Sequence, residues 1–597
     1  MNDNILKEKN EVEQELLGLD KRFSRIAGFR LLVFLVAVVL IFAGFGKHSF
    51  LLIGLGILFA VIFIVLVKIH GNLNEEIQSI RAKSQVLNRY LMRYSGEWKN
   101  FKDDGSEFLG PKDNLSHDLD LLGRNSLFQM ISIAHTSLGR KKLADTISLK
   151  NPDIKNVDKR YEAVTELTNK TQFLMNFEAS SERILEKREK EMERRGEERG
   201  EETEEATEKP KTETFPIWMY PLMLLVPAMN IVTIVMVLVG DMSPMRILTT
   251  FILGVIITFA PKTIQDYLIA PVYKYGIAAN DYHRMLTLIS ENEFESELLK
   301  DVYEKTASKD GLLSSIKSMG RIAAVNNISF NPLIHIVLAG FLGWDYYIAL
   351  AASNWSKKNK NVFEDCIDIV SDIEELGSLA VLSMVRNTTK AEIRDDMTLE
   401  MKNVYHPLLS VDTVIANDAK IDGKLTIITG SNMSGKTTFL RTVAVNMVLS
   451  YIGAGVCADE FSVPYMKIFT SMRIMDDVAG GISTFYAEIL RIKDMAEYVA
   501  SGNEVPAICL IDEIFKGTNS ADRIVGAKEA LSKLSKGNAL VMVSTHDFEL
   551  CDLSEDNYHF EEHYENGELK FDYKIRDGRC TTRNAMAILE MAGLVQN

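Results

Sequence analysis

Cysteine and proline are scarce in this chain, and no basic excess marks it as a general nucleic-acid binder. The 597 residues include 5 cysteines and 13 prolines. The cysteines are scattered and form no C-x-x-C pair, which gives no zinc signal and is typical of reduced, cytosol-facing thiols. Lys and Arg total 67 against 82 Asp and Glu, a net charge of −15. A nucleic-acid site would therefore have to be a local basic patch.

Long uncharged stretches are present, and the first two lie side by side in the sequence. Residues 31–46 and 49–67 carry no charge, and only Lys47 and His48 separate them. Two spans of about 17–25 residues joined by a tight turn predict a membrane hairpin over residues 31–69. A signal peptide is the alternative, but the second apolar stretch and the lack of a small-residue cleavage site argue against it.

A second pair of uncharged stretches, 214–240 and 247–261, predicts another hairpin within residues 215–270. Trp218 and Tyr220 at one end suit a membrane interface. Buried core helices are the alternative for both pairs. The stretch 332–353 is also apolar, but His335 and Asp345 interrupt it, so it is predicted to form a pair of core helices rather than a fifth span.

The basic residues indicate how such hairpins would be oriented. They cluster before the first span and after the second, with only Lys47 and His48 between the two. The positive-inside rule places residues 1–30 and everything after 68 in the cytoplasm. The expectation is a multi-pass protein of the cell membrane with four transmembrane helices in contact with the lipid bilayer.

The remaining segments before residue 400 look helical and soluble. Residues 1–30 form a polar N-terminal segment of mixed charge, and residues 75–180 and 273–400 have helix-type periodicity. Residues 181–214 are almost wholly charged, which predicts a solvated helix running into a linker. The helices of 273–400 are expected to act as levers that carry motion toward the C-terminal region.

A glycine-rich motif lies between a strand pattern and a helix pattern at residues 425–449. Residues 425–429 (LTIIT) predict a buried parallel strand, and GSNMSGKT at 430–437 matches G-x-x-x-x-G-K-[ST]. In this motif backbone N–H groups surround a polyphosphate, and the following helix N-terminus adds a favourable dipole. Lys436 is predicted to reach the β- and γ-phosphates of ATP, and the Thr437 hydroxyl to ligate Mg²⁺. The predicted nucleotide-binding set is Gly430, Ser431, Asn432, Met433, Ser434, Gly435, Lys436, Thr437 and Thr438.

Two further apolar strand patterns end in groups suited to ATP hydrolysis. Residues 506–513 (PAICLIDE) end in two carboxylates, of which Asp512 is predicted to hold the Mg²⁺ shell and Glu513 to act as general base. Residues 541–546 (VMVSTH) end in His546, which is predicted to sense or stabilise the γ-phosphate. A structural histidine is the alternative there.

A helix start at residues 480–485 (GGISTF) leaves two interpretations open. Ser483 or Thr484 occupies the N-cap, with Glu488 in the first turns. This arrangement suits either a simple helix cap or an anion-binding helix start.

Residues 401–597 resemble the ATPase domain of MutS-type DNA mismatch repair proteins, an ABC-like P-loop domain. The matching stretches run in family order: YHPLL (405–409), VIAND (414–418), TGSNMSGKTTFLRT (429–442), YIGAGVCA (451–458), DDVAGGISTFYAEI (476–489), LIDEIFKGTNSADR (510–523), STHDFEL (544–550) and YKIRDGRCTTRNAMAI (573–588). More weakly, residues 119–148 are similar to the start of the family's helical core.

The resemblance implies a homodimer through the ATPase domain, with Ser483 of one subunit reaching the nucleotide of the other. It also implies that Asn432 contacts the γ-phosphate, that residues 517–520 lie at the subunit interface, and that Tyr573 stacks on adenine. Val414 stands where the family has an aromatic residue. The implied fold is an α/β P-loop NTPase domain after a helical core and two transmembrane hairpins, with ATP and Mg²⁺ as cofactors and no other metal.

The chain also departs from the family pattern in its N-terminal part. Repair proteins of the family carry a Phe-x-Glu wedge that reads the mispair, and residues 1–100 contain no match to it. The expected function is a membrane-tethered, DNA-binding MutS-type ATPase whose hydrolysis switches a dimer. Mismatch repair or damage sensing is implied by the family alone. The alternative is an ATP-driven membrane switch that acts on a protein or lipid partner without DNA.

Overall fold

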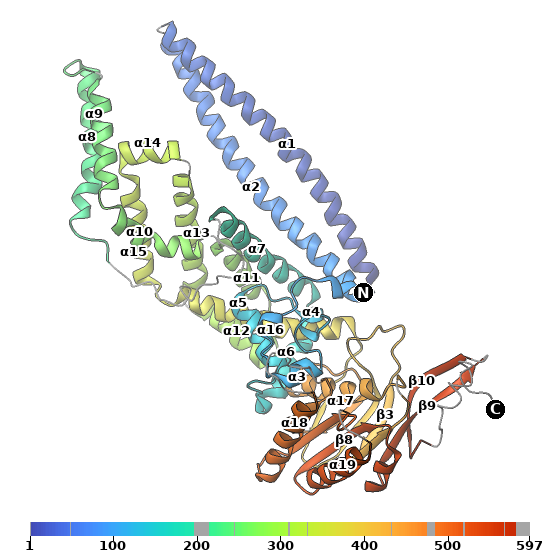
Figure 1. The fold of residues 1–597 in the computed structure, drawn as a ribbon. Helices are drawn as coiled ribbons and strands as arrows, with labels where there is room; N and C mark the ends of the chain where they lie inside the picture. The colour runs from blue at the N-terminus through green and yellow to red at the C-terminus, as the bar shows by residue number, and fades with distance from the viewer. Residues whose placement is uncertain are drawn as a thin grey trace.

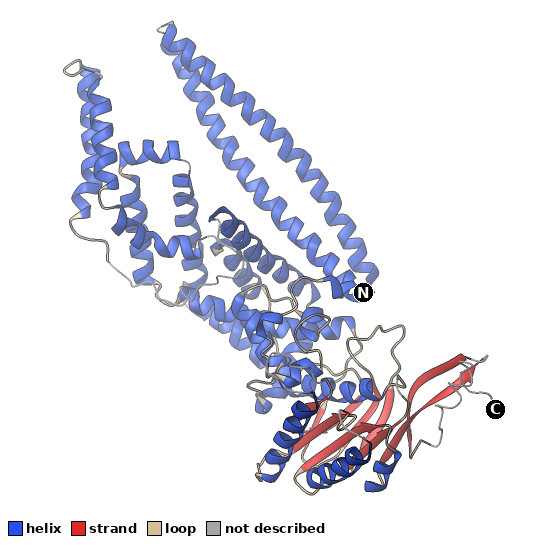
Figure 2. Ribbon diagram, in the orientation of Figure 1, coloured by secondary structure: helices blue, strands red, loops and turns tan. Residues whose placement is uncertain are grey.

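Among the described residues, every element up to Val385 is a helix, and the strands begin at Glu392 (Figure 2). The structure is a computed structural model. It describes residues 2–580 except His48, residues 196–213, Pro244, Ile277, residues 309–310, Asn331, Asn432, residues 474–483, residues 517–519 and residues 566–567. The C-terminal part of the charged linker and residues 581–597 therefore lie outside the description.

The first hairpin consists of two very long antiparallel helices, α1 (Asn2–Gly46) and α2 (Phe50–Ser95) (Figure 1). The predicted boundary at residue 31 does not interrupt α1, because a change from charged to apolar side chains does not by itself end a helix. Ile5, Val12 and Leu19 recur every seven residues and are buried, as in a coiled-coil seam. Near the tip, a Cβ on Gly56 would lie 2.6 Å from Cγ1 of Ile41, so this glycine allows the two helices to approach closely.

Residues 75–180, predicted as a helical region, are mainly helical, and α7 and the first 3₁₀ turn pack against α2. Gly96 ends α2 in the left-handed conformation that favours glycine. The following helices are α3 (Asn114–Asp118), α4 (Leu127–Ile131), α5 (Ser137–Ile147), α6 (Val157–Asn169) and α7 (Thr171–Arg195), with 3₁₀ turns at Glu97–Asn100, Ser106–Phe108 and Ile154–Asn156.

The second hairpin is formed by α8 (Met219–Val239) and α9 (Met245–Phe259). Beside it lie α14 (Pro332–Leu342) and α15 (Trp344–Lys358), which occupy the stretch 332–353 that was predicted to form a pair of core helices. Asn230 Nδ2 donates to the Gly340 carbonyl at 2.9 Å, and the Thr258 hydroxyl donates to the Ala339 carbonyl at 2.9 Å. The two residues that interrupt the apolar stretch pair with each other, with His335 Nε2 at 2.9 Å from Asp345 Oδ1.

The number of candidate membrane spans differs from the predicted four. Three described helices are long and apolar enough to cross a bilayer, namely α1, α2 and α8. The count rises to five if each of two bent helix pairs is one span. One pair joins α9 to α10 (Lys262–Tyr275) with a bend of 65°, and the other joins α13 (Leu312–Asn326) to α14 with a bend of 105°. Four spans are therefore not confirmed, because α9 alone has only 15 residues.

The remaining helices carry the chain to the C-terminal region. They are α11 (Ala279–Ser290), α12 (Glu297–Ser308) and α16 (Val362–Val385), with a 3₁₀ turn at Asn327–Phe330. Helix α16 is buried along most of its length and ends shortly before the first strand.

Two sheets form the C-terminal region. The smaller has the order β1-β5-β2-β3, built from Glu392–Arg394, Glu460–Pro464, Leu399–Val404 and Asn417–Ile421. The larger has the order β10-β9-β4-β8-β7-β6, built from Glu568–Asp577, Asn557–Glu565, Leu425–Thr429, Ala539–Thr545, Ala507–Asp512 and Lys467–Ser471. Helices α17 (Lys436–Tyr451), α18 (Thr484–Ala500) and α19 (Ser520–Ser535) pack against the larger sheet (Figure 1).

The apolar runs predicted as buried strands are confirmed. Strands β4, β7 and β8 are buried at every residue, and β8 pairs in parallel with both β4 and β7. Cys509 is buried in β7. Because the three strands are parallel, their carboxyl ends meet at one edge of the sheet, where α/β proteins bind ligands.

Candidate nucleotide site

The glycine-rich loop joins the carboxyl end of β4 to the start of α17. Gly430 has φ +149° and Gly435 has φ +115°, conformations that favour glycine. A Cβ on Gly430 would lie 2.8 Å from the Ser434 hydroxyl and 2.9 Å from the Phe560 carbonyl, so a larger residue would force the loop apart. Met433 is exposed and also has positive φ, at 70°. Asn432 lies outside the described residues.

Lys436 is the first residue of α17, and its ammonium lies over the loop. Its Nζ donates to the carbonyls of Gly430 and Ser431, each at 2.7 Å. Burial lowers the pKa of Lys436, and the carboxylates of Glu513 and Asp512 act against that effect. A buried ammonium with loop backbone around it is suited to an anionic ligand such as a polyphosphate.

Asp512, at the end of β7, accepts hydrogen bonds from two hydroxyls on different elements. The Thr437 hydroxyl donates to Oδ1 at 2.9 Å, and the Ser544 hydroxyl of β8 donates to the same oxygen. The structure thus brings the two predicted Mg²⁺ ligands together. Hard oxygen donors of this kind fit Mg²⁺, which keeps several waters and phosphate oxygens rather than a full protein cage.

Glu513 follows directly and faces two basic groups. Lys516 Nζ lies 3.4 Å from Glu513 Oε2 and 3.6 Å from Asp512 Oδ2, and His546 Nδ1 lies 3.9 Å from Glu513 Oε2. His546 is half exposed at the end of β8. Glu513 and His546, predicted from separate strand patterns, therefore share one edge of the sheet.

Arg523 of α19 is a neighbour of His546 that the motif analysis did not identify. It forms a two-pronged ion pair with Asp547, with Nη2 at 2.8 Å from Oδ1 and Nε at 2.9 Å from Oδ2. Its Nη2 also lies 3.5 Å from His546 Nε2. Lys516 and Ser544 were missed in the same way, although both lie inside stretches that resemble the family.

Tyr573 lies against the glycine-rich loop from β10. A Cβ on Gly435 would lie 3.4 Å from Cδ1 of its ring. Tyr573 has φ 54° and is 46% exposed, and Asn417 Nδ2 donates to its carbonyl at 3.0 Å. An exposed ring next to the loop is compatible with a contact to a nucleotide base. Ser483 and residues 517–519 of the interface segment lie outside the described residues.

Two aspartates connect this site to the helical region. Asp118 at the end of α3 is fully buried and accepts from the backbone N–H groups of Met472 and Arg473, each at 3.0 Å, and from Arg491 Nη1 at 2.9 Å. Asp120 pairs with Arg441 of α17 at 3.0 Å and with Arg473. The helical region therefore holds α17, α18 and the end of β6 directly.

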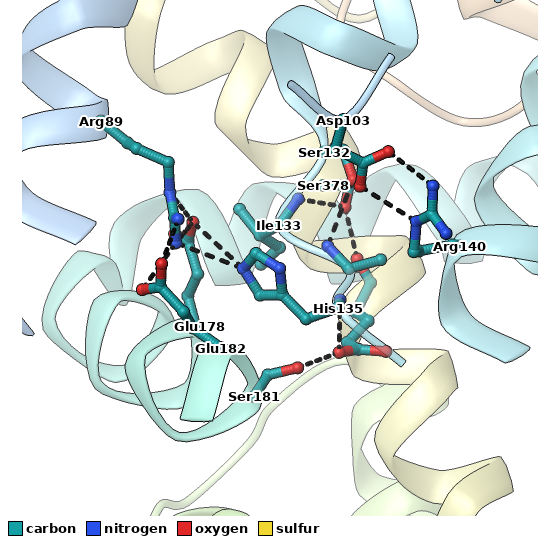
Figure 3. A network of polar contacts seen from close by, with 12 residues as sticks. Arg89, Asp103, Ser132, Ile133, His135, Arg140, Glu178, Ser181, Glu182 and Ser378 are labelled. Carbon is teal, nitrogen blue, oxygen red and sulfur yellow. Dashed lines mark hydrogen bonds and ion pairs between the residues drawn. The ribbon is translucent and has the colours of Figure 1, made fainter. Parts of the chain in front are cut away.

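A buried polar network joins the helical region to the long hairpin (Figure 3). Arg89 of α2 lies between Glu178 and Glu182 of α7, at 2.9 Å and 2.6 Å, and its Nη2 is 3.2 Å from His135 Nε2. Burial by itself would raise the pKa of Glu178, but Arg89, His135 and Arg93 bring it down to about 2. This carboxylate is therefore a charged interior group with fixed cationic partners.

The same network extends to α16 and on to the end of α17. Glu374 of α16 accepts from the backbone N–H groups of His135 and Thr136 at 3.0 Å and 3.2 Å. Its neighbour Glu375 pairs with Arg160, whose Nε donates to the Ile452 carbonyl at 2.8 Å. Ile452 caps α17, the helix that begins at Lys436. A continuous chain of polar contacts thus runs from α17 to α2.

Comparisons with known proteins agree with the resemblance in the C-terminal part. The family described as MutS domain V matches residues 426–597. A DNA mismatch repair protein MutS from Staphylococcus haemolyticus is 30% identical over 239 residues, and one from Listeria welshimeri is 30% identical over 238 residues. Both alignments cover 38% of this chain and 27% of the relative, so the chain spans about a quarter of the length of these relatives. The similarity supports a relationship to the MutS family through a C-terminal domain V with mixed α/β sheets.

Proposed function

We propose that this protein is a membrane-embedded, Mg²⁺-dependent ATPase of MutS type that works as a homodimer and uses ATP turnover as a conformational switch. The observation that carries the proposal is the convergence of Lys436, Thr437 and Asp512 where β4 and β7 end. A basic helix start and a hydroxyl–carboxylate pair in this arrangement suit the phosphates and the metal of Mg-ATP.

Each side chain has a distinct task in the proposed hydrolysis. The glycine-rich loop and Lys436 bind the phosphates, and Thr437 and Asp512 would hold Mg²⁺, which neutralises charge on the β- and γ-phosphates. Glu513 accepts a proton from the attacking water, and His546 stabilises the γ-phosphate. Ser544 fixes the orientation of Asp512, and Tyr573 contacts the adenine. Asn432 of the same glycine-rich loop and, from the other subunit, Ser483 complete the proposed site on the strength of the family resemblance.

The exposed apolar surface of both hairpins supports a membrane location. Phe42 and Leu51 near the tip of the first hairpin are 74% and 73% exposed, a poor arrangement in water. The tips of α1–α2 and of α8–α9 lie at the same end of the molecule, and the sheets lie at the other (Figure 1). One bilayer can therefore take both tips while the sheets stay in the cytoplasm.

The conformational switch has two candidate partners, DNA on the one hand and a protein or lipid on the other. The named relatives are DNA mismatch repair proteins, which favours DNA as a ligand of this protein. A chain of contacts runs from α17 through Arg160 to Glu375, and from the adjacent Glu374 through His135 to Arg89 of α2. It favours a second candidate, in which ATP turnover moves the hairpins against a protein or lipid partner. Both candidates use the same ATP site.

Nucleotide binding tests the proposal directly. Full-length protein in lipid nanodiscs is titrated with a fluorescent ATP analogue and Mg²⁺. Lys436→Ala is expected to abolish binding, whereas Lys536→Ala, an exposed lysine on the same domain, should bind like the unsubstituted protein. Equal binding by both variants would refute the site.

DNA is tested separately with duplex and four-way junction oligonucleotides. If DNA is the partner, binding should weaken steeply as salt rises, because lysines and arginines release counterions from the phosphates. If the affinity for these oligonucleotides at low salt is no higher than that of an acidic control protein, DNA is rejected as the ligand. The protein or lipid partner then remains as the candidate.

A further inference from the structure

The turn after β7 has a backbone that ordinary residues rarely adopt. Glu513 has φ 53° and Phe515 has φ 60°, and neither is glycine. Left-handed backbone at bulky residues persists only where the surroundings hold it in place. This turn carries both Glu513 and Lys516, so whatever fixes the turn also fixes the proposed general base and the ammonium group beside it.

A buried carboxylate from a different helix holds this turn. Glu488 of α18 is 2% exposed, and its Oε1 accepts from the backbone N–H of Phe515. The backbone N–H of Lys516 also donates to this carboxylate. Two consecutive N–H groups on one carboxylate fix the direction of the chain between Glu513 and Lys516.

Ring packing supports the same placement. The rings of Phe515 and Phe485 of α18 meet edge to face, with centroids 6.1 Å apart. On the other side, a Cβ on Gly526 of α19 would lie 3.4 Å from Cε2 of Phe515. Phe515 is therefore clamped between α18 and α19, while Glu488 takes up its N–H.

We propose that Glu488 is a positioning residue for hydrolysis, which holds Glu513 and Lys516 in place through the backbone of the intervening turn. The inference rests on the proposed ATPase function and adds a residue that does not touch the nucleotide. It also defines α18 as the link to the helical region. Arg491, one turn after Glu488, donates to the buried Asp118 of that region. A shift of the helical region would therefore move α18 and, with it, the turn that carries Glu513.

The test is steady-state ATP turnover by the full-length protein in nanodiscs, with nucleotide affinity and thermal midpoint measured on the same samples. Glu488→Ala should lower kcat about tenfold or more, because small misplacements of catalytic groups are costly. Affinity for the ATP analogue should stay within about twofold, since no phosphate contact is lost. Glu488→Gln keeps an acceptor oxygen, so it should recover most of the loss, and Glu497→Ala, an exposed glutamate of the same helix, should match the unsubstituted protein.

Several outcomes separate this inference from the proposed function. An unchanged kcat in Glu488→Ala, or equal losses in kcat and affinity, would overturn the positioning role while leaving the ATPase intact. If Glu488→Ala does not fold, a Glu488→Gln kcat as low as that of Glu513→Gln would overturn it as well. No turnover by the unsubstituted protein would refute the proposed function and this inference together.

The link to Asp118 is tested with a double-mutant cycle in the same assay. Arg491→Gln should lower kcat about threefold, and its effect should shrink when Glu488 is already alanine, because both act through α18. Strictly additive effects would show that Asp118 and Arg491 act on the site independently of Glu488.

Discussion

Two carboxylates of this molecule, Glu178 in the helical region and Asp512 at the edge of the larger sheet, have opposite surroundings. Glu178 is fully buried against Arg89 and Arg93, which are fixed by packing. Asp512 is bound by two hydroxyls and by Lys516, whose side chain is 48% exposed. The fixed cations all approach the first carboxylate at its Oε1 oxygen and balance its charge there. The hydroxyls and the half-exposed lysine leave the carboxylate of Asp512 able to bind a metal. Glu178 is therefore a structural charge, whereas Asp512 is a candidate for chemistry.

The largest expected effect is the loss of stability when the buried carboxylate of Glu178 is removed. Glu178→Ala leaves the buried guanidinium of Arg93 without its neighbouring carboxylate and removes one of the two carboxylates that pair with Arg89, so it should lower the free energy of unfolding by about 3–5 kcal/mol. Thermal unfolding of the detergent-solubilised protein measures it, with the exposed Glu162→Ala on α6 as control. A loss no larger than that of the control would show that Glu178 is not a structural charge.

Acid should reduce the contribution of Glu178 to the stability of the fold over a defined pH range. The pKa of Glu178 is about 2 in the folded protein and about 4.5 without its partners, so its contribution is complete above the higher value. The sign is therefore a loss of stability as the pH falls from about 4.5 toward 2, worth about 3 kcal/mol from this group. Thermal midpoints across that range should fall less steeply for Glu178→Gln than for the unsubstituted protein. Parallel pH profiles would contradict the assignment.

Substitution of Asp512 should affect ATP turnover and leave the stability of the fold nearly unchanged. Asp512→Asn removes charge from the proposed Mg²⁺ site and should lower ATP turnover about a hundredfold or more. Its thermal midpoint should stay close to that of the unsubstituted protein, since no fixed cation depends on it. If Asp512→Asn lost as much stability as Glu178→Ala and kept its turnover, Asp512 would be a structural charge and not part of a reactive site.

The smallest expected effect is at the hydroxyl that orients Asp512. Ser544→Ala removes one hydrogen bond to a charged group and should raise the Mg²⁺ concentration for half-maximal turnover about three- to tenfold. A titration of Mg²⁺ at fixed ATP measures it, beside Ser535→Ala at the end of α19. An unchanged Mg²⁺ requirement would show that Thr437 alone suffices to orient Asp512.

The sequence predicts the residues at the carboxyl ends of the central strands well, because the patterns that mark these strands lie within a few consecutive residues. Strands β4, β7 and β8 are buried at every residue. Strand β7 ends at Asp512, and β4 and β8 end one residue before Gly430 and His546. The contacts of Lys516, Ser544 and Arg523 were not predicted, because they depend on which strands and helices become neighbours. Glu488 was recognised only as a residue near a helix start, since its role depends on a turn 27 residues away.

The helical part was less predictable for a different reason. Charge patterns suggested a boundary near residue 31, yet α1 continues through it, because a change from charged to apolar side chains does not by itself end a helix. The span count also depends on how helices bend, which hydropathy does not encode. The 65° and 105° bends decide whether α10 and α13 belong to spans, and four spans were expected without them.

Phosphate release from Mg-ATP by the full-length protein in lipid nanodiscs tests the central claim most directly, with nucleotide binding measured on the same samples. The account predicts that the unsubstituted protein and Glu513→Gln bind the nucleotide equally well, and that only the unsubstituted protein releases phosphate at a substantial rate. Equal release from both proteins, or no binding by either, would contradict it.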